Sequence, residues 1–144
     1  MNPRLNGQVQ HVVSTLKADL PHLLETDISY DIYTPDIVFV DPVNRFRGKL
    51  SYRLILWSLR FHGKLFFTAL SFDLHRVDAA TPNTVTATWT VQGRLRVPWS
   101  TRLYFEGSST YRLTETGQIW QHVDSWDRSP GKILRQFLPA WISP

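Results

Sequence analysis

The sequence predicts an α+β fold in which a strongly curved antiparallel sheet forms a cone-shaped half-barrel around N-terminal helices. Two patterns predict it. In the first part of the chain, apolar residues recur at three- and four-residue spacing, as one face of an amphipathic helix requires. From Phe66 onward, apolar and polar residues alternate, which is the period of a strand with one buried face. Gly93 and Gly107 lie within these strands, where glycine usually marks a bulge or a sharp bend.

Two helices are expected in the first half of the chain. The first covers about residues 4–26, and its apolar face is formed by Leu5, Val9, Val12, Val13, Leu16, Leu20, Leu23 and Leu24. Pro21 should break this helix or begin a second short one, because proline cannot continue the backbone hydrogen bonding. The second helix covers about residues 48–62, beginning at Gly48 and ending near Gly63, since glycine is common just after the last helical turn.

Before a C-terminal tail over residues 128–144, five strands are expected, at about residues 30–41, 65–78, 83–97, 102–114 and 118–127. The clearest is 83–97, in which Val, Ala, Trp and Leu occupy one face while Thr, Gln and Arg occupy the other. Turns near residues 79–83 and 98–101 join neighbouring strands, so the strands are expected to form an antiparallel meander.

The size and composition indicate a single domain over residues 1–144. With 42% apolar and 19% charged residues, the chain is too apolar to be disordered. The absence of Cys excludes disulfides, thiolate metal ligands and a cysteine nucleophile. No run approaches the ~18 consecutive apolar residues of a membrane span, and no signal or transit peptide is evident. We therefore expect a soluble cytoplasmic or stromal protein.

The charge pattern and the motifs exclude several classes of function. The formal charge is +4 and most cations are Arg, but they are scattered along the chain, so nucleic-acid binding is not expected. No His, Asp and Glu residues show metal-ligand spacing. There is neither a glycine-rich phosphate loop nor a Gly-x-Ser-x-Gly nucleophile elbow. No metal and no cofactor are predicted.

The strand that ends at Asp41-Pro42 supplies the first candidate site residue. Such a strand places the Asp41 carboxylate at the edge of whatever pocket the fold encloses. There it can act as a general base with a raised pKa, orient a ligand, or accept hydrogen bonds from the backbone of the turn through Asn44. Asp-Pro is common in turns, so the structural role is favoured while the other two stay open.

The last strand supplies the second candidate, a histidine and a carboxylate on one face. His122 and Asp124 share this face with Trp120 and Trp126. A His with a neighbouring carboxylate can be a general acid–base pair or a buried hydrogen-bonded pair. The two Trp can form an aromatic wall for a flat ligand, but the favoured alternative is that both are core residues. In that alternative, Asp124 pairs with an Arg, for which the candidates are Arg102 and Arg112.

Several sequence blocks together resemble a known superfamily. A helix, a strand ending in Asp-Pro, a helix led by Gly and then long curved strands resemble the nuclear transport factor 2-like fold, shared with SnoaL-like cyclases and ketosteroid isomerases. More specifically, the chain resembles the domain of unknown function 2358, found in cyanobacteria, plants and some animals, over roughly Leu16 to Asp127. The blocks that carry this resemblance are residues 33–36, 39–42, 98–99, 105–111 and 122–127.

The resemblance implies a cone with a pocket. Asp41 matches the position of the general-base Asp of ketosteroid isomerases. The partners of that base differ, because Ser109 stands near the position expected for the second Asp and Lys17 where the first helix would carry a Tyr. These departures argue against steroid-isomerase chemistry. In such cones the outer sheet face often mediates homodimers, so a homodimer through the polar face of residues 84–96 is expected.

Three functions follow as alternatives. The first is binding of an apolar or aromatic small molecule, such as a pigment, tetrapyrrole, isoprenoid or lipid-like compound. The predicted pocket residues are Phe39, Trp57, Phe72, Trp89, Phe105, Tyr111, Asp124 and Trp126. The second is a cofactor-free isomerase, cyclase or lyase with Asp41 as the base and His122 or Tyr111 as its partner. The third is a structural homodimerisation domain. The apolar tail at residues 137–142 is expected to cover the cone mouth, bind a partner or touch a membrane.

Overall fold

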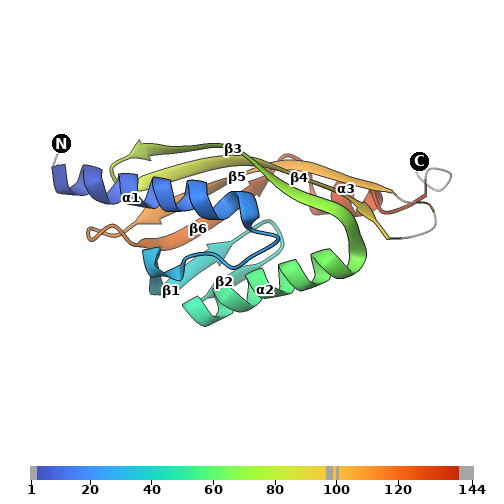
Figure 1. Ribbon diagram of the computed structural model, residues 1–144, viewed down its shortest axis with the longest axis horizontal. Coiled ribbons are helices and arrows are strands. Elements are labelled where there is room, and N and C mark those ends of the chain that lie inside the picture. Colours follow the sequence, from blue (N-terminus) through green and yellow to red (C-terminus); the bar gives the residue numbers. More distant parts are fainter. Residues whose placement is uncertain (1–2, 97–98, 100, 140–144) are drawn as a thin grey trace.

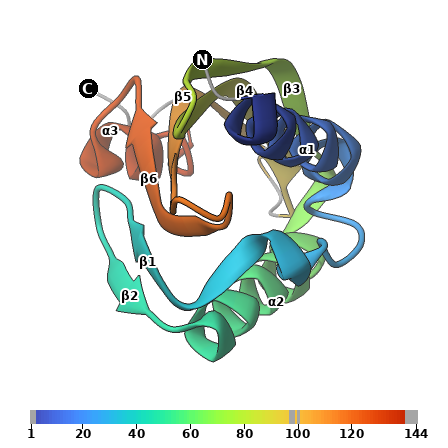
Figure 2. The ribbon, with the colours of Figure 1, turned by 90° about the vertical axis from the view of Figure 1, so that its left-hand side faces the viewer.

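The computed structural model describes residues 3–96, 99 and 101–139 of the chain. In this part, one curved and unclosed sheet of six strands wraps around an interior that α1 and α2 also border (Figures 1 and 2). The predicted α+β half-barrel is confirmed. The strand order is β2-β1-β6-β5-β4-β3. The strands are β1 Tyr33–Val40, β2 Arg45–Arg47, β3 Phe67–Thr81, β4 Thr84–Leu95, β5 Arg102–Leu113 and β6 Ile119–Trp126.

One strand pair departs from the predicted antiparallel arrangement. β3 to β6 form an antiparallel meander, but β1 lies parallel to β6, with Phe39 opposite His122. A parallel pair cannot be joined by a hairpin, and here the long connection through α2, β3, β4 and β5 supplies the crossover. This pairing brings the strand end at Asp41 close to the second half of β6.

Both helices differ in length from their predicted ranges. α1 covers Pro3–Asp19 and is followed by a short 3₁₀ turn, η1, at Leu20–His22. It is shorter than the predicted 4–26 because Pro21 lies in that turn. α2 covers Lys49–Phe66 and runs past the predicted end near residue 62. Gly63 is buried inside the helix, where a Cβ atom would lie 2.7 Å from the Leu70 side chain, so it serves close packing and not a helix end.

Three short elements were not predicted from the sequence. The first part of the predicted strand 30–41 is a 3₁₀ turn, η2, at Tyr30–Ile32. The strand β2 has only three residues, too few to show an alternating pattern. The helix α3, Pro130–Arg135, begins within the predicted tail, where the Ser129 side chain accepts a hydrogen bond from the backbone N–H of Lys132. The predicted strand end at residue 97 lies outside the described residues.

Gly107 marks a close approach, whereas Gly93 lies opposite a bulge in the neighbouring strand β3. The β4–β5 register is continuous through Gly93 and Gly107. A Cβ atom on Gly107 would lie 2.7 Å from the backbone oxygen of Ser125 and would also meet the ring of Trp89. The bulge opposite Gly93 is formed by Ala69 and Leu70, and Ala69 has a positive φ of 54°. This bulge lies just after α2, at the point where the chain turns into the sheet.

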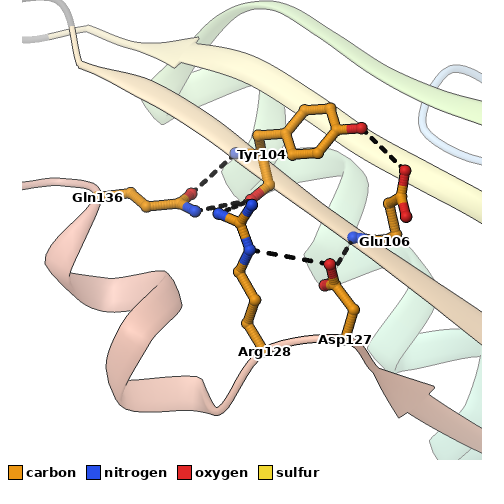
Figure 3. Close-up of polar contacts among 5 residues, drawn as sticks. All are labelled: Tyr104, Glu106, Asp127, Arg128 and Gln136. Carbon is orange, nitrogen blue, oxygen red and sulfur yellow. Dashed lines mark hydrogen bonds and ion pairs between the residues drawn. The ribbon is translucent and has the colours of Figure 1, made fainter.

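The C-terminal segment is fixed to the sheet by side-chain hydrogen bonds (Figure 3). The Gln136 amide donates to the backbone oxygen of Tyr104 at 2.7 Å, and its oxygen accepts from the Tyr104 N–H at 2.8 Å. Asp127 accepts a hydrogen bond from the Glu106 N–H at 2.9 Å and contacts Arg128 at 3.8 Å. The Gln136 side chain therefore hydrogen-bonds to both the N–H and the oxygen of one residue of β5, as a neighbouring strand would.

The start of the predicted tail also contacts the aromatic residues near the cone mouth. The Trp99 indole donates to the backbone oxygen of Phe137 at 3.0 Å, and the rings of Phe137 and Phe67 lie 5.8 Å apart. Residues 140–144, which carry the apolar positions Trp141 and Ile142 of that tail, lie outside the described residues.

The packed core occupies one end of the cone. α1 packs on β3 and β4, and its buried residues include Val9, Val12 and Leu16. Along β4, Val85 and Ala87 belong to this core, whereas residues further along the strand border a cavity. The core thus closes one end of the half-barrel and leaves the inner face of the sheet uncovered toward the other end.

Candidate functional site

The uncovered end of the half-barrel holds a cavity of about 730 Å³. Its walls are the inner face of the sheet, one side of α2 and the segment that follows α1. The lining is mainly apolar. Its aromatic members are Phe39, Phe46, Tyr52, Phe66, Phe67, Phe72, Trp89, Phe105, Tyr111 and Trp126.

Nearly all of the site residues chosen from the sequence border this cavity. They are Phe39, Asp41, Phe72, Trp89, Phe105, Tyr111, His122, Asp124 and Trp126. Trp57 does not. It lies on the outer side of α2, where it is 56% exposed and stacks on Phe61. The spacing of apolar residues shows which of them share a face of a helix. It does not show which face points inward when two faces are apolar, and α2 has two apolar faces.

Aromatic rings from consecutive strands form a continuous wall on one side of the cavity. Phe72 of β3 lies 5.1 Å from Trp89 of β4, measured between ring centroids. Trp89 meets Phe105 of β5 edge-on at 5.9 Å. Phe105 in turn lies 5.5 Å from Trp126 of β6. Such tilted and edge-on contacts are favourable and hold the rings in place, so the wall is formed in advance of any ligand.

A buried chain of hydrogen bonds lies beside this wall; we call it the buried polar chain. The Trp89 indole N–H donates to Ser109 Oγ at 2.9 Å, and Ser109 Oγ donates to Asp124 Oδ1 at 2.5 Å. The same Oδ1 lies 2.5 Å from His122 Nε2. His122 Nδ1 lies 2.8 Å from the Tyr52 hydroxyl. The buried polar chain thereby connects β4, β5, β6 and α2.

The proton positions in the buried polar chain follow from the chemistry of its members. An ionised Asp124 can only accept, so His122 Nε2 carries a hydrogen and donates it. In a neutral imidazole, Nδ1 is then the acceptor, and the Tyr52 hydroxyl donates to it. With this assignment the indole N–H, both hydroxyls and both ring nitrogens of the buried polar chain have partners. Among the described residues, the second carboxylate oxygen of Asp124, Oδ2, has no hydrogen-bond partner.

Two buried tyrosines, Tyr52 and Tyr111, contact the histidine, and a third, Tyr33, lies 5.0 Å from the Tyr52 ring. Burial raises the pKa of Tyr33, Tyr52 and Tyr111 well above the ordinary tyrosine value, so all three stay neutral hydroxyls. The Tyr111 ring lies 4.4 Å from the His122 ring, and Phe39 meets the same imidazole edge-on at 4.9 Å. These rings restrict the imidazole to one orientation.

Sequence reasoning missed Tyr33 and Tyr52. The resemblance implies a tyrosine on the first helix, whereas the phenol that hydrogen-bonds to His122 comes from α2. One signal for Tyr52 was available in the sequence. Tyr52 lies four residues before Leu56, so the two share one face of α2, and that face is buried.

Asp41 is held in a turn at the cavity rim. Its Oδ1 accepts hydrogen bonds from the backbone N–H groups of Val43 at 2.8 Å and Asn44 at 2.6 Å. The Asp41 N–H donates to the Asn44 oxygen at 2.9 Å. This is the structural role described for Asp in turns, and Asp41 nonetheless borders the cavity.

Two other expectations for the last strand are wrong. Asp124 does not pair with Arg102, which donates to the Gln92 side chain at 2.9 Å, and its partners are Ser109 and His122. Trp120 is 40% exposed and lies away from the core.

Neither a metal site nor a membrane-spanning helix is found in the described part of the chain. Over residues 3–96, 99 and 101–139, no three His, Asp or Glu side chains form a cluster that could hold a metal ion. None of the helices there has the length and apolar character needed to cross a bilayer.

The turn role of Asp41 predicts different effects for two substitutions. Asp41→Asn keeps an oxygen that can accept from Val43 and Asn44, so the free energy of unfolding should change by less than about 0.5 kcal/mol. Asp41→Ala removes the acceptor and should lower it by about 1–2 kcal/mol. Urea unfolding measures both. Equal losses in the two variants would show that the charge of Asp41, and not its turn, carries the stability.

The buried tyrosines predict a loss of stability at high pH. Their pKa values are raised in the folded state, so the unfolded chain ionises first, and stability is full below about pH 10 and falls above it. Each should contribute a slope of about 1.4 kcal/mol per pH unit. Denaturant unfolding across this pH range measures the slope. The Tyr52→Phe variant should lack the contribution of one tyrosine to it. Ionisation of every tyrosine near pH 10 without unfolding would contradict the assignment.

Comparisons with known proteins agree with this architecture. The family model for an uncharacterized conserved protein (DUF2358) matches residues 10–122. No curated protein matches the sequence. Among solved structures, a nuclear transport factor 2-like protein from Anabaena variabilis is 14% identical, with a TM-score of 0.61, over 90% of this chain and 94% of that chain.

Two further structures are similar in fold. A nuclear transport factor 2-like protein of unknown function from Cytophaga hutchinsonii is 9% identical, with a TM-score of 0.62, over 85% of this chain and 98% of that chain. A steroid delta-isomerase from Pseudomonas aeruginosa is 18% identical, with a TM-score of 0.53, over 94% of this chain and 87% of that chain. At these identities the likeness establishes the fold alone. The chain belongs to the uncharacterized conserved protein family DUF2358 and has the nuclear transport factor 2-like fold.

Proposed function

We propose that this protein binds an apolar or aromatic small molecule that carries one hydrogen-bond donor. The observation that carries the proposal is the apolar cavity of about 730 Å³ with a carboxylate oxygen of Asp124 left for a ligand. Ligand pockets in proteins typically measure roughly 300–1,000 Å³ and combine apolar walls with a few placed polar groups.

The aromatic wall supports a flat or elongated apolar ligand. Phe72, Trp89, Phe105 and Trp126 contact one another in sequence across four strands, so the wall needs no reordering when a ligand arrives. A preformed wall lowers the entropic cost of binding. Burial of apolar ligand surface against it supplies the favourable free energy.

The polar end of the cavity supports a ligand with a hydroxyl or N–H group. Asp124 is largely buried, with 17% of its side chain exposed, and both of its described hydrogen bonds end on Oδ1. The unpaired Oδ2 is not among the buried atoms of the described residues that lack a partner, so it is accessible and a ligand donor can hydrogen-bond to it. Pigments and tetrapyrroles with N–H groups, and isoprenoid or lipid-like alcohols, combine such a donor with a large apolar surface.

The proposal predicts that filling the cavity weakens binding of an apolar probe. N-phenylnaphthylamine is neutral, aromatic and carries one N–H, and its fluorescence rises in apolar surroundings. Val91→Trp places a large side chain on the cavity side of β4 and should weaken probe binding by about tenfold or more. Gln10→Trp, on the exposed side of α1 and away from the cavity, is the control and should bind as the wild type does. Equal binding by both variants would contradict the proposal.

A second candidate is a cofactor-free isomerase, cyclase or lyase. It is supported by two carboxylates at the cavity, Asp41 and Asp124. Both ring nitrogens of His122 are engaged by protein groups, so in this candidate His122 orients Asp124 and a carboxylate takes the proton from the ligand. Turnover lost in Asp41→Asn or Asp124→Asn, with affinity retained, would identify the base, and turnover retained in both would exclude this candidate.

We also propose a homodimer formed through the outer face of β3, β4 and β5. The homodimer is compatible with a ligand in the cavity, and it is also the third candidate function, in which the role of the domain is structural. The face is polar and ordered: His75 Nε2 lies 2.6 Å from the Thr90 hydroxyl, and Gln92 donates to Asp73 at 2.7 Å. Such bonds between neighbouring strands fix the side chains of this outer face, which suits it to a symmetric contact.

The homodimer predicts concentration-dependent association that a charge on this face abolishes. Thr86→Arg places like charges opposite each other across a two-fold contact and should yield monomer in sedimentation equilibrium. Glu115→Arg, in the turn after β5, adds more positive charge off this face and should leave the dimer intact. A wild-type protein that stays monomeric at every concentration would refute the proposal.

A further inference from the structure

We propose that the outer face of α2 docks this protein onto the surface of an anionic lipid membrane. The proposed partner is the bilayer surface itself, contacted by a helix that lies in the plane of the interface. This inference goes beyond ligand binding in the cavity, and the docking step does not depend on it.

The docking face is an exposed apolar stripe, formed by Leu50, Leu54, Trp57, Phe61 and Leu65. Their spacing of three and four residues places them on one side of the helix. Their exposed fractions are 71%, 56%, 56%, 49% and 53%, in that order. Trp57 and Phe61 stack on each other with ring centroids 5.3 Å apart, so this stripe presents an ordered surface.

No element of the described chain covers this stripe. α2 lies at the edge of the molecule in both views, with the sheet and α1 to one side of it (Figures 1 and 2). Its opposite face is already buried, through Tyr52, Leu56 and Gly63. A helix that is apolar on two sides while only one side is packed has an unpartnered surface, and contiguous exposed patches of this kind mark interaction sites.

The charges of α2 favour anionic lipid over a second copy of the chain. The helix carries Lys49, Arg53, Arg60 and Lys64 and contains neither Asp nor Glu. Arg60 pairs with Asp27 at 3.4 Å and Arg53 stacks over the Tyr30 ring at 4.8 Å, whereas Lys64 is exposed near the end of the helix. A symmetric contact between two α2 helices would bring Lys49 and Lys64 close to their copies, and the helix offers no carboxylate to compensate them. Lipid phosphates and carboxylates would neutralise them.

The stripe meets the cavity at one edge. Leu54 belongs to the stripe and also lines the cavity. Leu59 and Phe66, each 49% exposed, line the cavity from the side of α2 that carries Gly63, away from the stripe. A protein docked by this face would place the Leu54 edge of the cavity beside the membrane surface. An apolar ligand could then exchange with the bilayer without crossing water, a consequence that rests on the proposed function.

Co-sedimentation with lipid vesicles tests the docking. The full chain should sediment with vesicles of phosphatidylcholine containing about one third phosphatidylserine, and roughly tenfold more weakly with phosphatidylcholine alone. Trp57→Ser combined with Phe61→Ser should weaken binding to the anionic vesicles by about tenfold or more, because two large apolar groups no longer enter the interface. Trp120→Ser is the matched control, since Trp120 is an exposed tryptophan on β6 and its loss should leave binding unchanged.

The outcomes separate this inference from the proposed function. Absence of wild-type binding, or equal binding by the double variant, would overturn the docking. A lipid-free dimer that the double variant converts to monomer would assign the stripe to a second copy and would also overturn it. N-phenylnaphthylamine binding by the same double variant, compared with the wild type, reports on the cavity alone. Loss of docking with probe binding intact therefore leaves the proposed function in place.

Discussion

The structure depends on one buried carboxylate and the donors that hold it. Asp124 Oδ1 accepts from Ser109 and from His122, and through them it is connected to Trp89 and Tyr52. These residues come from three strands and one helix, so the position of α2 over the open sheet is tied to the register of β4, β5 and β6. Loss of any link leaves a buried polar group without its partner, which costs about 1–3 kcal/mol.

The same arrangement leaves the open end of the cone unfilled. The core residues of α1 and β4 close one end, and the aromatic wall lines the other without filling it. α2 borders that end with one face and presents a second apolar face outward. A fold held together by a buried polar chain can keep a cavity open, because its stability does not require that side chains fill the space between helix and sheet.

The sequence predicted the fold class and several residues of the cavity lining for a physical reason. Alternation of apolar and polar residues fixes which side of a strand faces inward, so Phe72, Trp89 and Phe105 were placed correctly. Features that depend on packing between distant elements were not predictable. They include the parallel β1–β6 pair, the outward position of Trp57 and the role of Gly63, which depends on the approach of Leu70. Tyr52 was missed because nothing in its local sequence shows that it meets His122, seventy residues away.

Mass spectrometry of the native protein purified from its own source, with its absorbance spectrum, would show whether the cavity holds a small molecule. We expect a co-purifying molecule that is largely apolar, bears a hydroxyl or N–H group and is lost from the Val91→Trp variant. A protein that carries no ligand from its own source and fails to take up the neutral aromatic probe would contradict this expectation. That result would leave a cone whose cavity binds nothing and whose role is structural.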